Sequence, residues 1–267
     1  MFPYKFGFIG AGNMGFAIMK GLVQSFQPED IIFYEKNEQR AEDVAAAIGA
    51  KKADSGFACA DSSWFVVLAV KPQQLGAAVK EIRNGITGKQ VLISIAPGVT
   101  MEDLKEYFGQ DCRVVRAMPN TPALVGEGMT GVCYDPERFS KEEQECIKDF
   151  FESFGKMALV DEKLINAVVC VSGSSPAYVY LFLEALADSG VKYGLPRKMA
   201  YEMAAQAVLG SAKMLLETGQ HPGALKDQVC SPGGTTIEAV AALEENGFRN
   251  AVMKGCDACY AKCENIR

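Results

Sequence analysis

Short apolar runs alternate with amphipathic helical patterns from residue 4 to about residue 160. The runs are rich in Val, Ile and Phe, as in strands that are buried on both faces. They predict strands at Lys5–Ile9, Ile31–Tyr34, Trp64–Val70, Val91–Ile95, Arg113–Ala117 and Gly131–Tyr134. The amphipathic patterns predict helices at Met14–Ser25, Gln39–Ile48, Gln73–Arg83 and Met101–Tyr107. This alternation indicates an α/β fold with a doubly wound, mainly parallel sheet.

The pattern changes after about Asp161, where strand-like runs disappear and the remaining chain is helical. Helices are predicted from near Pro176 to Val191, from Pro196 to Leu216, after Pro222, after the turn at 231–234, and over Phe248–Ala261. We therefore expect two domains, residues 1–160 and an all-α domain of residues 161–267. The small residues of Ala204–Ala212 allow close helix packing. A subunit interface and a tightly packed helix within the chain explain them equally well.

Composition narrows the class of protein. The 267 residues include 49% hydrophobic and 22% charged residues, as in a globular domain, and the formal net charge is −6. No basic stripe occurs, so we expect no nucleic-acid partner. The start of the chain lacks the pattern of a signal peptide, and no uninterrupted apolar run reaches the ~20 residues of a membrane span. Nine scattered cysteines favour reduced thiols, so we expect a cytoplasmic protein without a membrane partner.

A glycine loop follows the first predicted strand, whose last residue is Ile9. The loop is Gly10-Ala11-Gly12-Asn13-Met14-Gly15, and a predicted helix opens from it, which is the context that this motif requires. Gly10 permits a tight turn, Gly12 lets the backbone approach a pyrophosphate, and Gly15 lets the helix pack on the strand. A glycine-rich turn without a ligand is the weaker alternative. The loop indicates a Rossmann-type domain that binds a dinucleotide through the helix N-terminus.

Glu35 ends the second predicted strand, roughly 20–25 residues after the loop, where an acidic side chain accepts the ribose 2′-hydroxyl of NAD. A carboxylate there would repel the 2′-phosphate of NADP. Lys36 and Arg40 could neutralise that phosphate if Glu35 turned away. A solvated surface glutamate is also compatible with the sequence, so the cofactor is expected to be NADPH or NADH.

Two more strand ends are expected to face the cofactor. Ala69-Val70-Lys71-Pro72 ends one strand and Ile95-Ala96-Pro97 ends the next, and ligands bind at the carboxyl ends of strands in open α/β sheets. Lys71 fits a functional role beside the nicotinamide as well as it fits an ordinary surface position.

The turn Ser231-Pro232-Gly233-Gly234-Thr235-Thr236 precedes a helical run in the second half of the chain. Two glycines before hydroxyl residues at a helix start form a concave set of N–H donors. We favour a carboxylate or phosphate site over the alternative, in which Thr235 or Thr236 is an ordinary N-cap.

Other polar features are explained without a ligand. Ser174 or Ser175 is expected to cap a helix that opens at Pro176. His221, the only histidine, is expected in a turn, so a Ser-His-Asp hydrolase is improbable. Three cysteines on one face of the last predicted helix lack a fourth ligand, and no metal site is expected.

The chain resembles the pyrroline-5-carboxylate reductase family almost from end to end. The matching segments are Gly7–Gly12, Ala69–Pro72, Met118–Ala123, Ser172–Ala177, Ala185–Val191, Gly194–Arg197, His221–Gly223 and, most specifically, Ser231–Thr236 with the helix after it. The resemblance implies an NAD(P)H-dependent oxidoreductase of CH–NH groups that reduces 1-pyrroline-5-carboxylate to L-proline, the last step of proline biosynthesis. It also implies a helical dimerisation domain and self-association as a homodimer or a higher oligomer.

Site residues are carried over by position. The resemblance implies that Gly10–Gly15 hold the pyrophosphate and that Ala69–Pro72 with Ile95–Pro97 line the nicotinamide. It implies that the turn from Ser231, chiefly Gly233–Thr236, holds the substrate carboxylate, with the Thr236 hydroxyl beside the ring nitrogen. Thr236 and Lys71 are the catalytic candidates, and Ser55 and Asn120 are further candidates for contact with the cofactor.

The chain departs from the family pattern in two places. Ser175 replaces a glycine, which would strain the backbone if φ were positive there, and Asp54-Ser55-Gly56 lacks the asparagine found near the adenosine. A β-hydroxyacid dehydrogenase would need a lysine that is absent between Leu164 and Leu186, and a non-catalytic dinucleotide sensor would not need the turn at 231–236.

Overall fold

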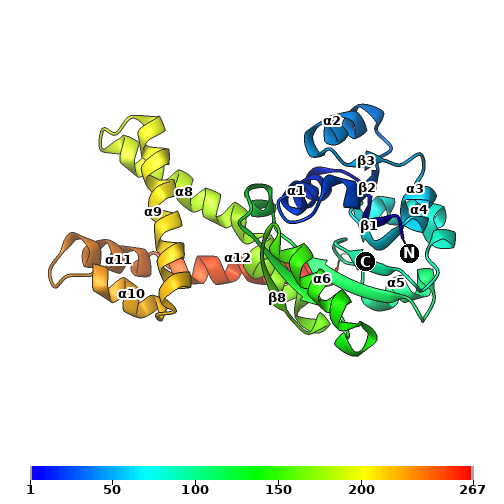
Figure 1. Ribbon diagram of the computed structural model, residues 1–267. Coiled ribbons are helices and arrows are strands. Elements are labelled where there is room, and N and C mark those ends of the chain that lie inside the picture. Colours follow the sequence, from blue (N-terminus) through cyan, green and yellow to red (C-terminus); the bar gives the residue numbers. More distant parts are fainter. Residues whose placement is uncertain (1, 266–267) are drawn as a thin grey trace. The chain divides into compact units, whose positions relative to one another are not determined.

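The computed structural model describes residues 2–265, and its contacts divide them into two compact units (Figure 1). One unit runs to Ser174 and includes the chain from Tyr260 onward, and the other is Ser175–Cys259. The domain boundary expected between residues 160 and 161 stays a prediction.

Within residues 2–265, eight strands of the first unit form a single sheet in the order β3-β2-β1-β4-β5-β6-β7-β8. Every neighbouring pair is parallel except β6 with β7, which confirms the doubly wound, mainly parallel sheet. The order reverses between β1 and β4, where such sheets bind ligands beyond the strand ends. The strands are β1 Tyr4–Ile9, β2 Ile31–Tyr34, β3 Lys51–Lys52, β4 Ser63–Leu68, β5 Val91–Ser94, β6 Arg113–Met118, β7 Gly128–Cys133 and β8 Gly155–Leu159.

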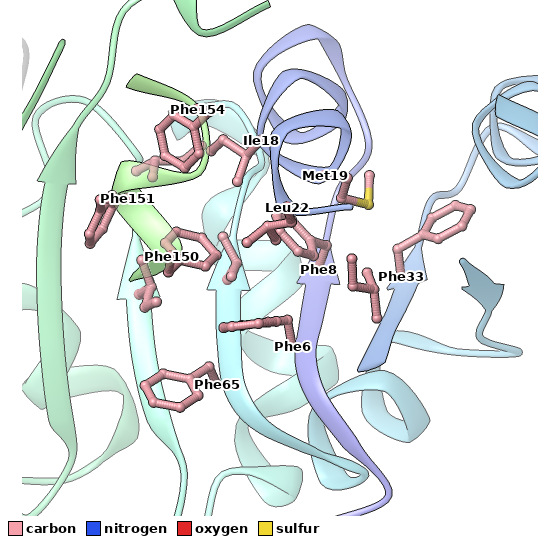
Figure 2. Close-up of a cluster of buried hydrophobic side chains, with 14 of the residues drawn as sticks. Phe6, Phe8, Ile18, Met19, Leu22, Phe33, Phe65, Phe150, Phe151 and Phe154 are labelled. Carbon is pink, nitrogen blue, oxygen red and sulfur yellow. The ribbon is translucent and has the colours of Figure 1, made fainter. Parts of the chain in front are cut away.

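Helices cover both faces of the sheet, and each face has its own apolar cluster. Residues of α1, α2 and α6 pack on one face, and residues of α3, α4 and α5 pack on the other. Figure 2 shows the first cluster, in which Phe6 and Phe8 of β1 lie against Phe150 of α6; the ring centroids of Phe6 and Phe150 are 5.2 Å apart. The helices are α1 Asn13–Leu22, α2 Glu38–Ile48, α3 Gly56–Asp61, α4 Pro72–Ile82, α5 Met101–Phe108 and α6 Lys141–Glu152.

The second unit is all α, as predicted. Within Ser175–Cys259 the buried residues are small, namely Ala187, Ala200 and Ala204, and large apolar side chains such as Leu181 and Leu216 are exposed. Helices α8 and α9 can approach closely because the residues between them are small. A Cβ added at Gly190 would lie only 3.2 Å from the Ala200 Cβ. The helices are α8 Ser175–Lys192, α9 Arg197–Thr218, α10 Pro222–Val229, α11 Thr235–Glu245 and α12 Phe248–Glu264, whose last residues belong to the first unit.

The serine-rich segment before Pro176 lies within a helical stretch of the chain. Helix α7 (Ile165–Val168) continues through a π-helical turn at Val169–Gly173 into α8, and the Ser174 N–H donates to the Val169 carbonyl over 2.7 Å. Helix α8 begins at Ser175, and the predicted cap at Ser174 or Ser175 stays a prediction. Ser175 is not strained, since among the described residues only glycines have a positive φ.

One helical run in the described part of the chain, Glu162–Lys192, is long and apolar enough to cross a membrane by length and composition alone. Only 11% of its 18-residue apolar window is buried. Ser172–Ser175 interrupt its apolar residues, which is why the sequence shows no continuous run. Such a run also occurs in helices that pack against another protein surface.

Candidate active site

The loop between β1 and α1 needs glycine at two positions for the fold, and at a third glycine its backbone is open. Gly10 has a φ of +97°, and an added Cβ would lie 2.9 Å from the Ala69 carbonyl oxygen. A Cβ at Gly15 would lie 2.6 Å from the Gly10 carbonyl oxygen. At Gly12 a Cβ would meet no protein atom within 4 Å, so the backbone is open to an approaching group there.

The N-terminus of α1 is electrostatically suited to a pyrophosphate. Gly12 is its N-cap residue and no side chain caps the first turn, so the N–H groups from Asn13 onward point out of the loop with the positive end of the helix behind them. This open cradle fits the phosphates of a dinucleotide. Ile9 and Ala11 are buried beneath it, and Met14 is half-buried.

Two further strand ends lie beside the glycine loop, as predicted from their places in the chain. The Ala69 N–H donates to the Ile9 carbonyl over 2.9 Å, which joins the end of β4 to the end of β1. The Ile95 N–H donates to the Leu68 carbonyl over 3.3 Å, which joins β5 to β4. The structure thus brings together Ile9–Gly15, Ala69–Pro72 and Ile95–Pro97, with the Lys71 side chain exposed at the start of α4.

Glu35 lies directly after β2 and is half-buried against the glycine loop. Its Oε2 accepts the Ala11 N–H over 2.9 Å, and its Oε1 accepts the Asn37 N–H over 3.0 Å. Arg40 approaches the same loop residue from α2, since its Nε donates to the Ala11 carbonyl over 3.0 Å. The end of β2 and the glycine loop are therefore one hydrogen-bonded structure.

Glu81 of α4 is a polar residue of this region that sequence reasoning missed. Its Oε1 accepts the Gly56 N–H over 2.8 Å, and its Oε2 lies 3.7 Å from the Lys36 Nζ. Glu81 is 46 positions after Glu35 in the sequence, so only the packing of α4 shows that it belongs here. Ser55 lies beside it and caps α3, accepting the Ala58 N–H over 3.1 Å.

Asn120 is buried, and its side-chain amide makes two hydrogen bonds within the protein. Its Oδ1 accepts the Met129 N–H over 2.8 Å, and its Nδ2 donates to the Ser172 carbonyl over 3.0 Å. Pro176 has no N–H with which to bond that carbonyl in the ordinary helical manner. Asn120 therefore satisfies the helical carbonyl that Pro176 leaves unpaired, while its expected contact with a cofactor stays a prediction.

The second glycine turn, Ser231–Thr236, also ends in a helix without a side-chain cap. Gly233 has a φ of +66°, and the Gly234 N–H donates back to the Ser231 carbonyl over 3.0 Å. Gly234 is the N-cap residue of α11 and makes no side-chain cap bond, so capping by Thr235 or Thr236 is ruled out. The first N–H groups of α11 are thus available to an anion, as a substrate carboxylate would require.

Other reactive side chains have structural positions. The His221 Nδ1 accepts the Gly223 N–H over 3.1 Å and caps α10. Burial raises the pKa of the Cys112 and Cys133 thiols to about 11, which keeps them protonated. Among residues 2–265, no cluster of three His, Cys, Asp or Glu side chains is placed to hold a metal ion.

Comparisons with known proteins agree with this organisation. The family model for pyrroline-5-carboxylate reductase dimerisation matches residues 162–266, and one for NADP oxidoreductase, coenzyme F420-dependent, matches residues 5–98. The pyrroline-5-carboxylate reductase of Escherichia coli K12 is 47% identical, and that of Arabidopsis thaliana is 41% identical. The alignments cover 98% of this chain in both cases, with 98% and 95% of the two relatives.

Solved structures give the same result. A pyrroline-5-carboxylate reductase from Coxiella burnetii superposes with a TM-score of 0.91 at 32% identity, covering 98% of both chains. A pyrroline carboxylate reductase from Plasmodium falciparum, with NADP bound, superposes with a TM-score of 0.88 at 32% identity, covering 99% of this chain and 98% of that one.

Proposed function

The chain belongs to the pyrroline-5-carboxylate reductase family, and from that premise we propose which of its residues carry the reaction. It is an NAD(P)H-dependent oxidoreductase that reduces the C=N bond of 1-pyrroline-5-carboxylate to give L-proline, as the likeness over almost the whole chain indicates. The structural observation that carries the residue assignment is the presence of two uncapped helix N-termini, one in each unit.

The cofactor is proposed to bind along the first unit. Gly10–Gly15 and the first turn of α1 would hold the pyrophosphate, and Glu35, Lys36 and Ser55 would face the adenosine. Ile9, Ala69–Pro72 and Ile95–Pro97 would line the nicotinamide, and Asn120 is a further candidate for contact with the cofactor. When bound, the reduced dinucleotide supplies the hydride.

The substrate is proposed to bind at the turn at residues 231–236. The N–H groups of Gly233–Thr236 would hold the carboxylate, and the Thr236 hydroxyl would orient the ring nitrogen. A protonated cyclic imine is already electrophilic, so the protein has chiefly to position it. Lys71 would add positive charge beside the nicotinamide. The absence of an acid–base histidine from this scheme agrees with the capping role of His221.

The family membership implies self-association through the helical part of the chain, and we propose a homodimer or a higher oligomer built from dimers. The exposed apolar residues of α8 and α9 support this assignment. It explains the apolar run Glu162–Lys192 as a protein contact and removes the need for a membrane partner. We place the enzyme in the cytoplasm, which suits a chain with nine scattered cysteines, and assign it no nucleic-acid partner.

The direct test is the oxidation of NADH and of NADPH by the purified protein in the presence of 1-pyrroline-5-carboxylate, followed by the loss of absorbance of the reduced nicotinamide. We expect turnover and the formation of proline. A folded protein that binds dinucleotides but turns over with neither would instead be a dinucleotide sensor.

A further inference from the structure

The Glu35 carboxylate is fixed in place by backbone donors on both of its oxygens. The Ala11 N–H holds Oε2 and the Asn37 N–H holds Oε1, over 2.9 and 3.0 Å. Ala11 is buried in the glycine loop, so a turn of the side chain would leave its N–H without this acceptor. Hydrogen bonds to a charged acceptor are among the stronger ones, and together they oppose rotation of Glu35 out of the site.

Neither of the two neighbouring cations, Lys36 and Arg40, forms an ion pair with this carboxylate. Lys36 lies toward Glu81 on α4, and Arg40 donates its Nε to the Ala11 carbonyl with its guanidinium 4.9 Å from the centre of the Phe16 ring. Among the described residues Glu35 forms no ion pair.

The Tyr34 hydroxyl lies close to the carboxylates of Glu81 and Glu35. Burial raises the pKa of Tyr34, and the negative charges of Glu81 and Glu35 raise it further. Tyr34 is the last residue of β2, so the carboxylates of Glu81 and Glu35 both act on the end of this strand. A group that brings more negative charge to this place is disfavoured.

We propose that Glu35 makes this enzyme select NADH over NADPH, an inference that rests on the cofactor site assigned above. Dinucleotide folds place the adenosine ribose at the end of the second strand. Two of the roughly four lone-pair positions of the carboxylate remain available there, and a 2′-hydroxyl can donate to them. A 2′-phosphate offers only acceptors and brings negative charge against a carboxylate that two hydrogen bonds hold in place.

The experiment measures dissociation constants of the purified protein for NAD⁺ and NADP⁺ by titration calorimetry, together with those for 5′-AMP and 2′,5′-ADP. The Glu35→Ser and Glu35→Gln variants remove the charge. Glu38→Gln is the matched control, since it removes an equal charge from an exposed residue three positions later. The ratio of kcat/KM for NADH and NADPH is measured on the same proteins with 1-pyrroline-5-carboxylate.

We expect the wild type to bind NAD⁺ at least about tenfold more tightly than NADP⁺, with the same order for the two nucleotide fragments. Both Glu35 variants should reduce the ratio of the two dissociation constants about tenfold, chiefly because NADP⁺ binds more tightly. Glu38→Gln should leave this ratio within about twofold of the wild-type value. Equal or tighter binding of NADP⁺ by the wild type would overturn the proposal. So would an NAD⁺ preference that persists in both Glu35 variants. Selective binding without turnover would overturn the proposed reaction and leave this selectivity standing.

Discussion

At Gly12 the backbone has a φ of −63°, which every residue can adopt, and an added side chain would enter open space. We therefore predict that Gly12→Val leaves the free energy of unfolding within about 1 kcal/mol of the wild type, because nothing in the fold is displaced. The branched side chain would occupy the place of the pyrophosphate, and we expect the dissociation constants of both dinucleotides to rise at least about 100-fold. Calorimetry and chemical denaturation check the two effects separately.

Gly15→Ala provides the contrast for that prediction. Its Cβ would lie 2.6 Å from the Gly10 carbonyl oxygen, so this smaller change should destabilise the fold itself. If Gly12→Val binds dinucleotides with unchanged affinity, the glycine loop is not part of the cofactor site.

Thr236 tests the second glycine turn. Its hydroxyl makes no cap bond in α11, so Thr236→Ala should change stability by less than about 0.5 kcal/mol. We expect kcat to fall roughly 10- to 100-fold because the ring nitrogen loses its partner, with dinucleotide affinity within about twofold. Steady-state kinetics and calorimetry measure both. Thr235→Ala, which keeps the backbone N–H, is the control, and a loss of cofactor binding in Thr236→Ala would show that the role is misassigned.

Single residues were predictable where local chemistry decides their role. The glycines at 10, 12 and 15 follow from the need for a tight turn, an open backbone and a close helix. Glu81 and the double hydrogen bond of Asn120 were not predictable, because each joins residues far apart in the chain.

Among the elements, α6 depends on a buried ion pair at its first turn. The Arg113 Nη1 of β6 lies 2.5 Å from the Glu143 Oε1. The Glu143 Oε2 accepts the Ser140 N–H over 2.8 Å. Burial alone would raise the pKa of Glu143, but the Ser140 hydrogen bonds and the Arg113 guanidinium outweigh it and hold the pKa below its ordinary value. The Arg113 Nε is buried without a partner, so this guanidinium depends on Glu143 and on the Lys89 carbonyl.

Glu143→Gln should lower the free energy of unfolding by about 2–3 kcal/mol at pH 7, because it leaves the Arg113 charge poorly compensated. A carboxyl whose folded pKa is depressed stabilises the protein above its unfolded pKa of about 4.5, and this contribution is lost as the pH falls through the folded value. The difference between wild type and variant should therefore be constant above about pH 5.5 and shrink below pH 4.5. Denaturation at several pH values measures it. The exposed Glu142→Gln should cost under about 0.5 kcal/mol, and a pH-independent difference would contradict the assignment.

Elements were predictable where their pattern is strong, and the omissions have physical causes. The strand β3 consists of Lys51 and Lys52 and carries no apolar signal, while the five residues of β8 are half-buried or exposed. Strands β3 and β8 join the sheet by backbone pairing with β2 and β7, and their side chains show no strand pattern in the sequence. Helix α6 could have been found, because Ser140 and Glu143 form a capping box ahead of an amphipathic run.

At the scale of the whole molecule, the second unit has too little buried apolar surface for a core of its own. Within Ser175–Cys259 the large side chains of α8 and α9 lie at the surface, and a stripe of apolar residues runs along α9 at helical spacing. The exposed stripe consists of Ala205, Leu209, Ala212 and Leu216. This favours the subunit interface over the intrachain explanation of the small-residue segment, since no part of the second unit covers these side chains.

We predict that Leu209→Glu weakens self-association. A buried leucine contributes about 1.5–3 kcal/mol, and a symmetric dimer loses it from both copies, so the dissociation constant should rise at least about 100-fold. Sedimentation equilibrium over a range of protein concentrations measures the change. Lys198→Gln, at a fully exposed position, alters the net charge by the same amount and should leave the assembly intact. An unchanged mass for Leu209→Glu would place the contact on another face of the helical unit. If Leu209→Glu dissociates and its melting temperature also falls, the second unit depends for its stability on a partner copy that buries its exposed apolar side chains.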